Sequence, residues 1–194
     1  MLRPVRTVAP TVDLVTLDEV KARLRITDSD QDDVIIGLID AVTAHMDGYS
    51  GILGRCLLNQ TWRQDFRFWP AGSICLPFPD VSSVTVTYFD ADNAEQTLAS
   101  SRYELLENAR GSFVHFLDAF TAPTLYDDRS DAVQVTMVAG YGVTAASVPA
   151  SIRTAAILMI GHLYEHREAS TMDSLERLPM GVDSLLRPHR RVRL

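Results

Sequence analysis

The sequence predicts an α+β protein in which a small helical bundle carries an inserted antiparallel β-sheet module and an extended C-terminal tail. Changes of hydrophobic period and of charge along the chain support this prediction. Apolar residues recur at helical spacing before residue 59, alternate with polar residues up to about residue 142, and return to helical spacing from residue 148. The last eight residues, 187–194, then carry four arginines and no acidic residue.

Two helices are predicted after an extended arm, residues 1–15. Thr16 and Glu19 have the spacing of a capping box, which satisfies two backbone amide donors at a helix start. The second helix should run from about Gln31 to Tyr49. Its buried face is predicted from apolar residues spaced by three and four positions, namely Ile35, Ile39, Val42, Met46 and Tyr49.

Four acidic residues lie around the start of the second helix: Asp28, Asp30, Asp32 and Asp33. A calcium-binding loop of the type that their spacing suggests needs Gly at its sixth position and Glu at its twelfth. Counted from Asp28, these positions hold Asp33 and Ile39, so the match fails. We predict instead that Asp30 caps the second helix and that its neighbours face the positive end of the helix dipole.

From Asn59 to about Gly142 the sequence is typical of short antiparallel strands. Polar and apolar residues alternate in 83–88, and the residues that follow, 90–93, favour a turn. Further strands are predicted at 103–106, 113–117 and 133–138. We expect five or six strands, with the aromatic residues in the core of this module.

The last long helix begins at Val148–Pro149 and carries two apolar stripes. The first consists of Ile152, Ala155, Ala156, Met159 and Leu163, and the second of Ile157, Ile160 and Tyr164. A helix that is apolar on two faces must be covered from two sides. One apolar face packs against the helix's own domain, and the other packs against either the sheet or a neighbouring subunit. The second stripe is therefore a candidate subunit interface.

Composition excludes several classes of function. The longest apolar run, 155–160, is far below the roughly 20 residues of a membrane-spanning helix, and no apolar region follows the first arginines, so we expect neither a membrane protein nor a secretory signal. Cys56 and Cys75 make no metal-ligand pair and no disulfide framework, which suits a reduced cytosolic environment.

Charge is distributed unevenly along the chain. The net charge is −7, but residues 1–186 hold 14 basic against 25 acidic side chains. An acidic body binds DNA poorly, because neutralisation of phosphates supplies most of the non-specific affinity. The basic end is instead typical of an interaction tail.

One motif has a catalytic form, since His162, Glu165 and His166 match H-x-x-E-H. Both histidines would share a helix face, and Glu165 would be the general base of a zinc hydrolase. A catalytic zinc also needs a third protein ligand from another element, and downstream of His166 the only acids lie in the tail. We interpret the motif as the last turn of an amphipathic helix and expect no enzyme, no metal and no cofactor. The zinc hydrolase remains an alternative, as does a β module (59–146) that binds a carbohydrate or peptide.

Several segments resemble phage head–tail connector (adaptor) proteins of the gp6-like class, which include the adaptors of gene transfer agents. The resemblance covers most of the chain and lies in the order and spacing of 16–24 (TLDEVKARL), 54–62, 138–152, 162–168 and 178–190. It implies a non-enzymatic subunit of a ring, usually of twelve copies, between the portal protein and the tail of a phage or phage-like particle. The ring would extend the DNA channel without binding DNA specifically, and would support the next connector or stopper protein of the tail.

The resemblance also assigns expected roles to parts of the chain. The helical connector domain would comprise 16–58 and 147–168, the β module 59–146, and the tail 169–194. The candidate portal contacts are Leu185, Leu186, Arg187, Arg190, Arg191 and Arg193. The four acidic residues around the start of the second helix, Asp28, Asp30, Asp32 and Asp33, would line the channel and repel DNA. Assembly would take place in the bacterial cytoplasm.

Overall fold

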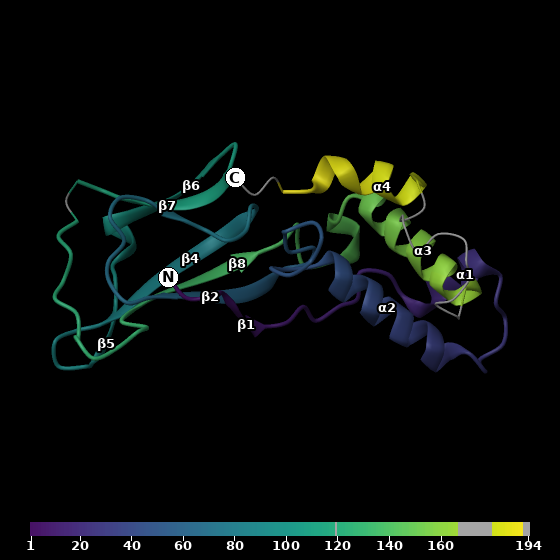
Figure 1. Ribbon diagram of the computed structural model, residues 1–194, viewed down its shortest axis with the longest axis horizontal. Helices are drawn as coiled ribbons and strands as arrows, with labels where there is room; N and C mark the ends of the chain where they lie inside the picture. The colour runs from purple at the N-terminus through teal and green to yellow at the C-terminus, as the bar shows by residue number, and fades with distance from the viewer. Residues whose placement is uncertain (119, 167–179, 192–194) are drawn as a thin grey trace. The chain divides into compact units, whose positions relative to one another are not determined.

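The computed structural model describes residues 1–118, 120–166 and 180–191. The chain forms two compact units (Figure 1). The β unit consists of residues 1–10 and 59–141, and the helical unit of residues 11–58 and 142–194. Strands and helices are thus segregated, with the strands inserted between helices, which confirms the predicted α+β class.

The β unit contains two antiparallel sheets. In spatial order, the five-stranded sheet consists of β1 (Val5–Val8), β2 (Gln60–Phe66), β8 (Val133–Ala139), β4 (Val81–Phe89) and β5 (Glu95–Thr97). The three-stranded sheet consists of β3 (Ile74–Cys75), β7 (Gly111–Phe116) and β6 (Tyr103–Asn108), with the short 3-10 turn η1 (Ser100–Arg102) before β6. The described residues therefore form eight strands instead of five or six. The extra strands are short, or lie in the N-terminal arm, and alternation could not reveal them.

The core of the β unit is formed by side chains of both sheets. Trp62 of β2 contacts Phe78, with their ring centroids 4.9 Å apart, and Phe78 is completely buried. Trp62 also donates a hydrogen bond from Nε1 to Oε1 of the buried Gln60 (3.1 Å). The other fully buried strand residues include Val86, Val114, Val133, Val135 and Met137. The expectation of a core of aromatic residues is correct in part, because Trp62, Phe66, Phe78 and Tyr103 are buried whereas Phe68 is 65% exposed.

The helical unit contains α1 (Leu17–Leu24), α2 (Asp32–Met46), η2 (Ala145–Ser147), α3 (Ala150–Glu165), α4 (Met180–Leu186) and η3 (Arg187–His189). Helix α3 packs against α1, α2 and α4. Gly161 lies where α1 approaches α3, since a Cβ atom there would lie 3.1 Å from Cδ2 of Leu24. No described helix is both long enough and apolar enough to cross a bilayer.

The predicted buried faces are largely correct. Ile35, Ile39, Val42 and Met46 of α2 are buried, as are Ile152, Ala155, Ala156 and Met159 of α3. There are two exceptions. Leu163 lies in the last turn of α3 and is 41% exposed, and Tyr49 lies beyond the end of α2 and is half-buried.

Three local predictions need correction. The N-cap of α2 is Gln31, which makes no side-chain cap, and Asp30 instead donates its backbone amide to Oδ1 of Asp28 (3.3 Å). The arm is not a separate segment, because it supplies β1 to the five-stranded sheet and buries Leu14 and Val15. The described part of the tail, 180–191, is helical from 180 to 189 rather than extended.

The capping box of α1 is present as predicted. Glu19 donates its amide to Oγ1 of Thr16 (3.2 Å), and Thr16 donates its amide to Oε2 of Glu19 (2.8 Å). We expect Thr16→Ala to lower the free energy of unfolding by about 1 kcal/mol, because one amide of the first turn loses its partner. Urea denaturation measures this loss. Thr11→Ala is the control, since Thr11 is exposed and lies outside the helix, and an equal loss in both variants would contradict the role of the cap.

Candidate assembly surfaces

The candidate subunit-interface residues of α3 differ in exposure. Ile160 is completely buried, whereas Ile157 and Tyr164 are half-buried. Ile160 is therefore a core residue of the subunit and not a contact for a neighbour. Helix α3 is enclosed by several elements of its own unit, because α4, a helix contributed by the tail, packs against it together with α1 and α2. The chain itself thus covers part of the second stripe.

Other apolar side chains of the helical unit are more exposed than these candidates. Leu158 of α3 is 37% exposed, and Val34 and Ile36 of α2 are 47% and 44% exposed. Sequence reasoning missed the two residues of α2 because they lie outside its regular stripe. A signal was present, however: between Val34 and Ala44 only Asp40 and Thr43 are polar, so α2 is apolar on more than one face.

The candidate portal contacts differ in burial. Leu186 is completely buried and Leu185 is half-buried, so Leu186 belongs to the core of the helical unit and not to a docking surface. Arg187 and Arg190 are exposed. Arg190 forms an ion pair with Asp183, with Nη2 and Oδ1 2.9 Å apart. Arg193 lies outside the described residues.

Two contacts fix the end of the described segment to the helical unit. The amide of Arg191 donates a hydrogen bond to the carbonyl oxygen of Leu53 (2.9 Å). Nε2 of His189 lies 2.7 Å from Oγ of Ser151 in α3. Burial lowers the pKa of His189, and the positive charge of Arg55 lowers it further. The fold therefore holds His189 neutral while the arginines beside it face solvent.

This environment predicts a dependence of stability on pH. Because the pKa of His189 is lower in the folded protein than its ordinary value of 6.5, unfolding favours proton uptake. The stability that neutral His189 contributes is fully present above pH 6.5 and is lost as the pH falls below it. We expect the wild-type protein to lose more stability between pH 8 and pH 5 than His189→Gln, which does not titrate. Urea denaturation at both pH values tests this, and equal losses would contradict it.

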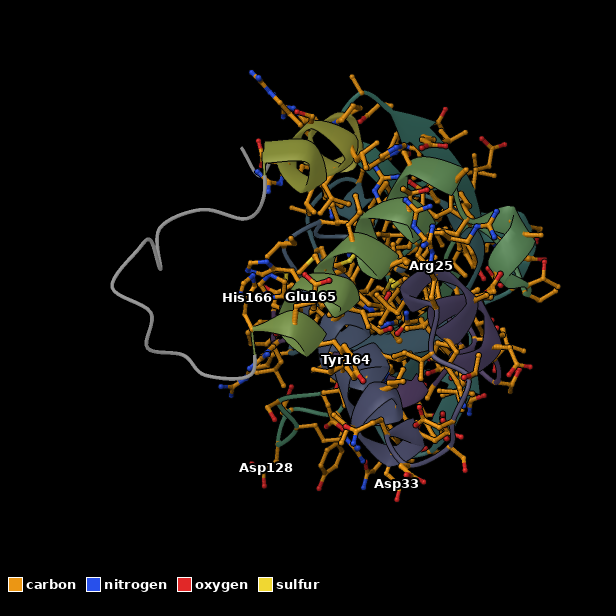
Figure 2. All side chains as sticks on the ribbon, turned by 90° about the vertical axis from the view of Figure 1, so that its right-hand side faces the viewer. Arg25, Asp33, Asp128, Tyr164, Glu165 and His166 are labelled. Atoms are coloured by element: carbon orange, nitrogen blue, oxygen red, sulfur yellow. The ribbon has the colours of Figure 1, made fainter. Side chains whose placement is uncertain are left out.

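The four candidate channel residues, which lie around the start of α2, differ in their surroundings. Asp32 forms an ion pair with Nζ of Lys21 (2.6 Å) and so links α2 to α1. Asp28, Asp30 and Asp33 are exposed, and Figure 2 shows Asp33 at the start of α2. Three of the four candidate channel residues therefore present their charge to solvent.

His162, Glu165 and His166 are all exposed at the C-terminal end of α3. The two histidine rings lie close together, with centroids 4.6 Å apart. Figure 2 shows Glu165 and His166 well apart from Asp33. Within the described ranges, no group of three or more His, Cys, Asp or Glu side chains could hold a metal ion. Glu168, Asp173 and Glu176 lie outside those ranges, and Asp183 pairs with Arg190.

Comparison with known families identifies the class of protein. The family model described as phage gp6-like head-tail connector protein matches residues 14–112, just over half of the chain. The chain belongs to this connector family. The match spans α1, α2 and strands β2 to β6. No curated protein sequence matches the connector.

Solved structures with the same fold come from gene transfer agent (GTA) particles. One, from the neck of an empty GTA particle computed with C6 symmetry, has a TM-score of 0.80 and 20% identity, and the match covers 100% of the connector and 97% of that chain. A second, from the virion of a native GTA particle, has a TM-score of 0.79 with the same identity and coverage. A third, from the neck of a native GTA particle computed with C12 symmetry, has a TM-score of 0.65 and 20% identity, covering 97% of each chain.

Proposed function

We propose that this connector is a structural subunit that forms a ring of twelve copies between the portal protein and the tail of a phage or gene transfer agent. The ring extends the DNA channel, and the next connector or stopper protein of the tail assembles on it. The observation that carries the proposal is the likeness to neck subunits over whole chains, together with membership of the head–tail connector family. Subunits are made in the bacterial cytoplasm and function in the assembled particle.

The surfaces of the helical unit support this assembly role. Arg187 and Arg190 form a basic site on an otherwise acidic protein, and arginine suits bidentate contacts with carboxylates. We assign this site to the portal protein. Exposed acids such as Asp28 and Asp33 suit a channel through which DNA slides without specific binding, because like charges repel.

Deletion of the gene in a particle-producing cell, with the wild-type gene on a plasmid as control, tests the proposal. We expect DNA-filled heads without tails when the gene is absent, and normal particles when it is restored. Cryo-electron microscopy of the restored particles should show a ring of this fold between portal and tail. Tailed particles without the connector, or density for the connector elsewhere, would contradict the proposed function. Stoichiometric zinc in the purified protein, lost in His162→Ala, would instead favour the hydrolase alternative.

A further inference from the structure

We propose that neighbouring subunits of the ring are joined by their sheet edges, with β1 of one copy lying against β6 of the next copy. The proposed partner is therefore a second copy of this chain. This inference rests on the proposed function, because it specifies how the ring is held together. It concerns only the β unit, where both edges lie.

The β unit has four sheet edges among the described strands. Strands β1 and β5 are the edges of the five-stranded sheet, and β3 and β6 are the edges of the three-stranded sheet. An edge strand presents unpaired amide and carbonyl groups that can accept another strand, and short edge strands limit such pairing. Strands β3 and β5 have two and three residues, whereas β1 has four and β6 has six. The longer edges are thus β1 and β6.

These two edges carry opposite charges. Arg3 and Arg6 lie in and beside β1, Glu104 and Glu107 lie in β6, and all four residues are exposed. Residues directly opposite each other on paired strands point to the same face of the sheet, and opposite charges there are favourable. Because both pairs are three positions apart, each arginine can face a glutamate whether the strands run parallel or antiparallel.

Apolar side chains on the same edges fit this pairing. Val5 and Val8 are 54% and 55% exposed, and Leu106 of β6 is 39% exposed. The amide of Leu2 donates to the carbonyl oxygen of Asp65 (2.8 Å), so the backbone beside Arg3 also follows β2. When β6 of one subunit lies against β1 of the next, Val5, Val8 and Leu106 are shielded from water. The arginines of β1 and the glutamates of β6 pair beside them.

The charges also decide which symmetry the contact produces. Pairing β1 with β1 would place arginine against arginine, and pairing β6 with β6 would place glutamate against glutamate, both of which are unfavourable. A β1–β6 contact uses two different patches of each subunit. Such head-to-tail contacts generate rings when the rotation between copies closes and open filaments when it does not, whereas self-complementary contacts generate two-fold dimers. The edge charges therefore favour a ring.

Charge exchange in assembled particles tests the proposal. We expect R3E/R6E and E104R/E107R each to reduce the number of connector copies per particle by about tenfold, because like charges then meet across the interface. Combining all four substitutions should restore at least half of the wild-type number. The control is Arg67→Glu, an equivalent charge reversal at an exposed residue of the same unit that lies outside both β1 and β6. Circular dichroism of each purified variant shows whether it is folded. Unchanged copy numbers in both double variants, or loss without rescue in the fourfold variant, would overturn the proposal.

Cysteine pairs provide a second, independent readout in particles. Opposite residues on adjacent strands have Cα atoms about 4.5–5.5 Å apart, which a disulfide can span. In a Cys75→Ser background we combine Val5→Cys with Leu106→Cys for parallel strands and with Leu105→Cys for antiparallel strands. One pair should produce a ladder of covalent multimers on a non-reducing gel, while each single variant should give at most dimers. A visible ring without a ladder from either pair overturns the edge contact alone, whereas the absence of a ring overturns the proposed function.

Discussion

Replacing Arg187 and Arg190 by glutamate is expected to prevent the connector from attaching to portal-bearing heads while the subunit stays folded. Both side chains are exposed, and the contact that the structure gives Arg190 is an ion pair with the half-exposed Asp183. Surface ion pairs contribute at most about 1 kcal/mol to stability. Reversal of two charges at a docking site, by contrast, creates repulsion of several kcal/mol, which lowers binding at least about tenfold.

The matched control for this variant is R23E/R25E. Arg23 and Arg25 are also exposed and also belong to the helical unit, near the end of α1. Heads incubated with each purified variant are sedimented, and the bound connector is quantified at several salt concentrations. We expect near-normal binding of the control and strong loss with R187E/R190E. Equal binding of the two variants would show that the basic site does not dock the portal.

Charge reversal tests the site more cleanly than removal of residues 187–194. Truncation also deletes the hydrogen bond between His189 and Ser151 and the bond from the Arg191 amide to Leu53. We still expect the truncated protein to fold and to lose attachment. Only this deletion tests Arg193, because Arg193 lies outside the described residues and is not replaced in the charge-reversal variants.

Leu186→Ala is expected to destabilise the helical unit strongly, by about 2–5 kcal/mol. The side chain is completely buried, so its truncation removes apolar contacts and leaves a cavity where α4 packs on α3. The adjacent Leu185 is half-buried and supplies the control. Leu185→Ala should cost clearly less, since part of its surface is already in contact with water.

Urea denaturation of both variants measures the difference. The result also separates two roles that sequence alone assigned together, because both leucines were candidate portal contacts. If Leu186→Ala keeps wild-type stability but fails to bind heads, Leu186 is a docking residue and does not stabilise the core of the helical unit. If Leu186→Ala is destabilised and only Leu185→Ala affects binding, the half-buried Leu185 belongs to the docking site.

Much of the candidate site could be predicted from local sequence, but not its exposure. The arginines after residue 186 were recognised from charge alone, and Arg187 and Arg190 are indeed exposed. The acidic residues around the start of α2 were also recognised from charge alone, although Asp32 forms an ion pair with Lys21 of α1. Neither α4 nor the burial of Leu186 has a comparable local signal, because seven residues are too few to establish a period.

By itself, the sequence determined the class of fold and the elements whose signals are local. Hydrophobic period identified α2, α3 and the longer strands, and the capping box identified the start of α1, because these features depend on residues only a few positions apart. Tertiary structure alone decided that β1 joins the sheet, that Ile160 is internal, and that Leu186 is core. Each of these outcomes depends on contacts between segments distant in sequence, so no local pattern can report them.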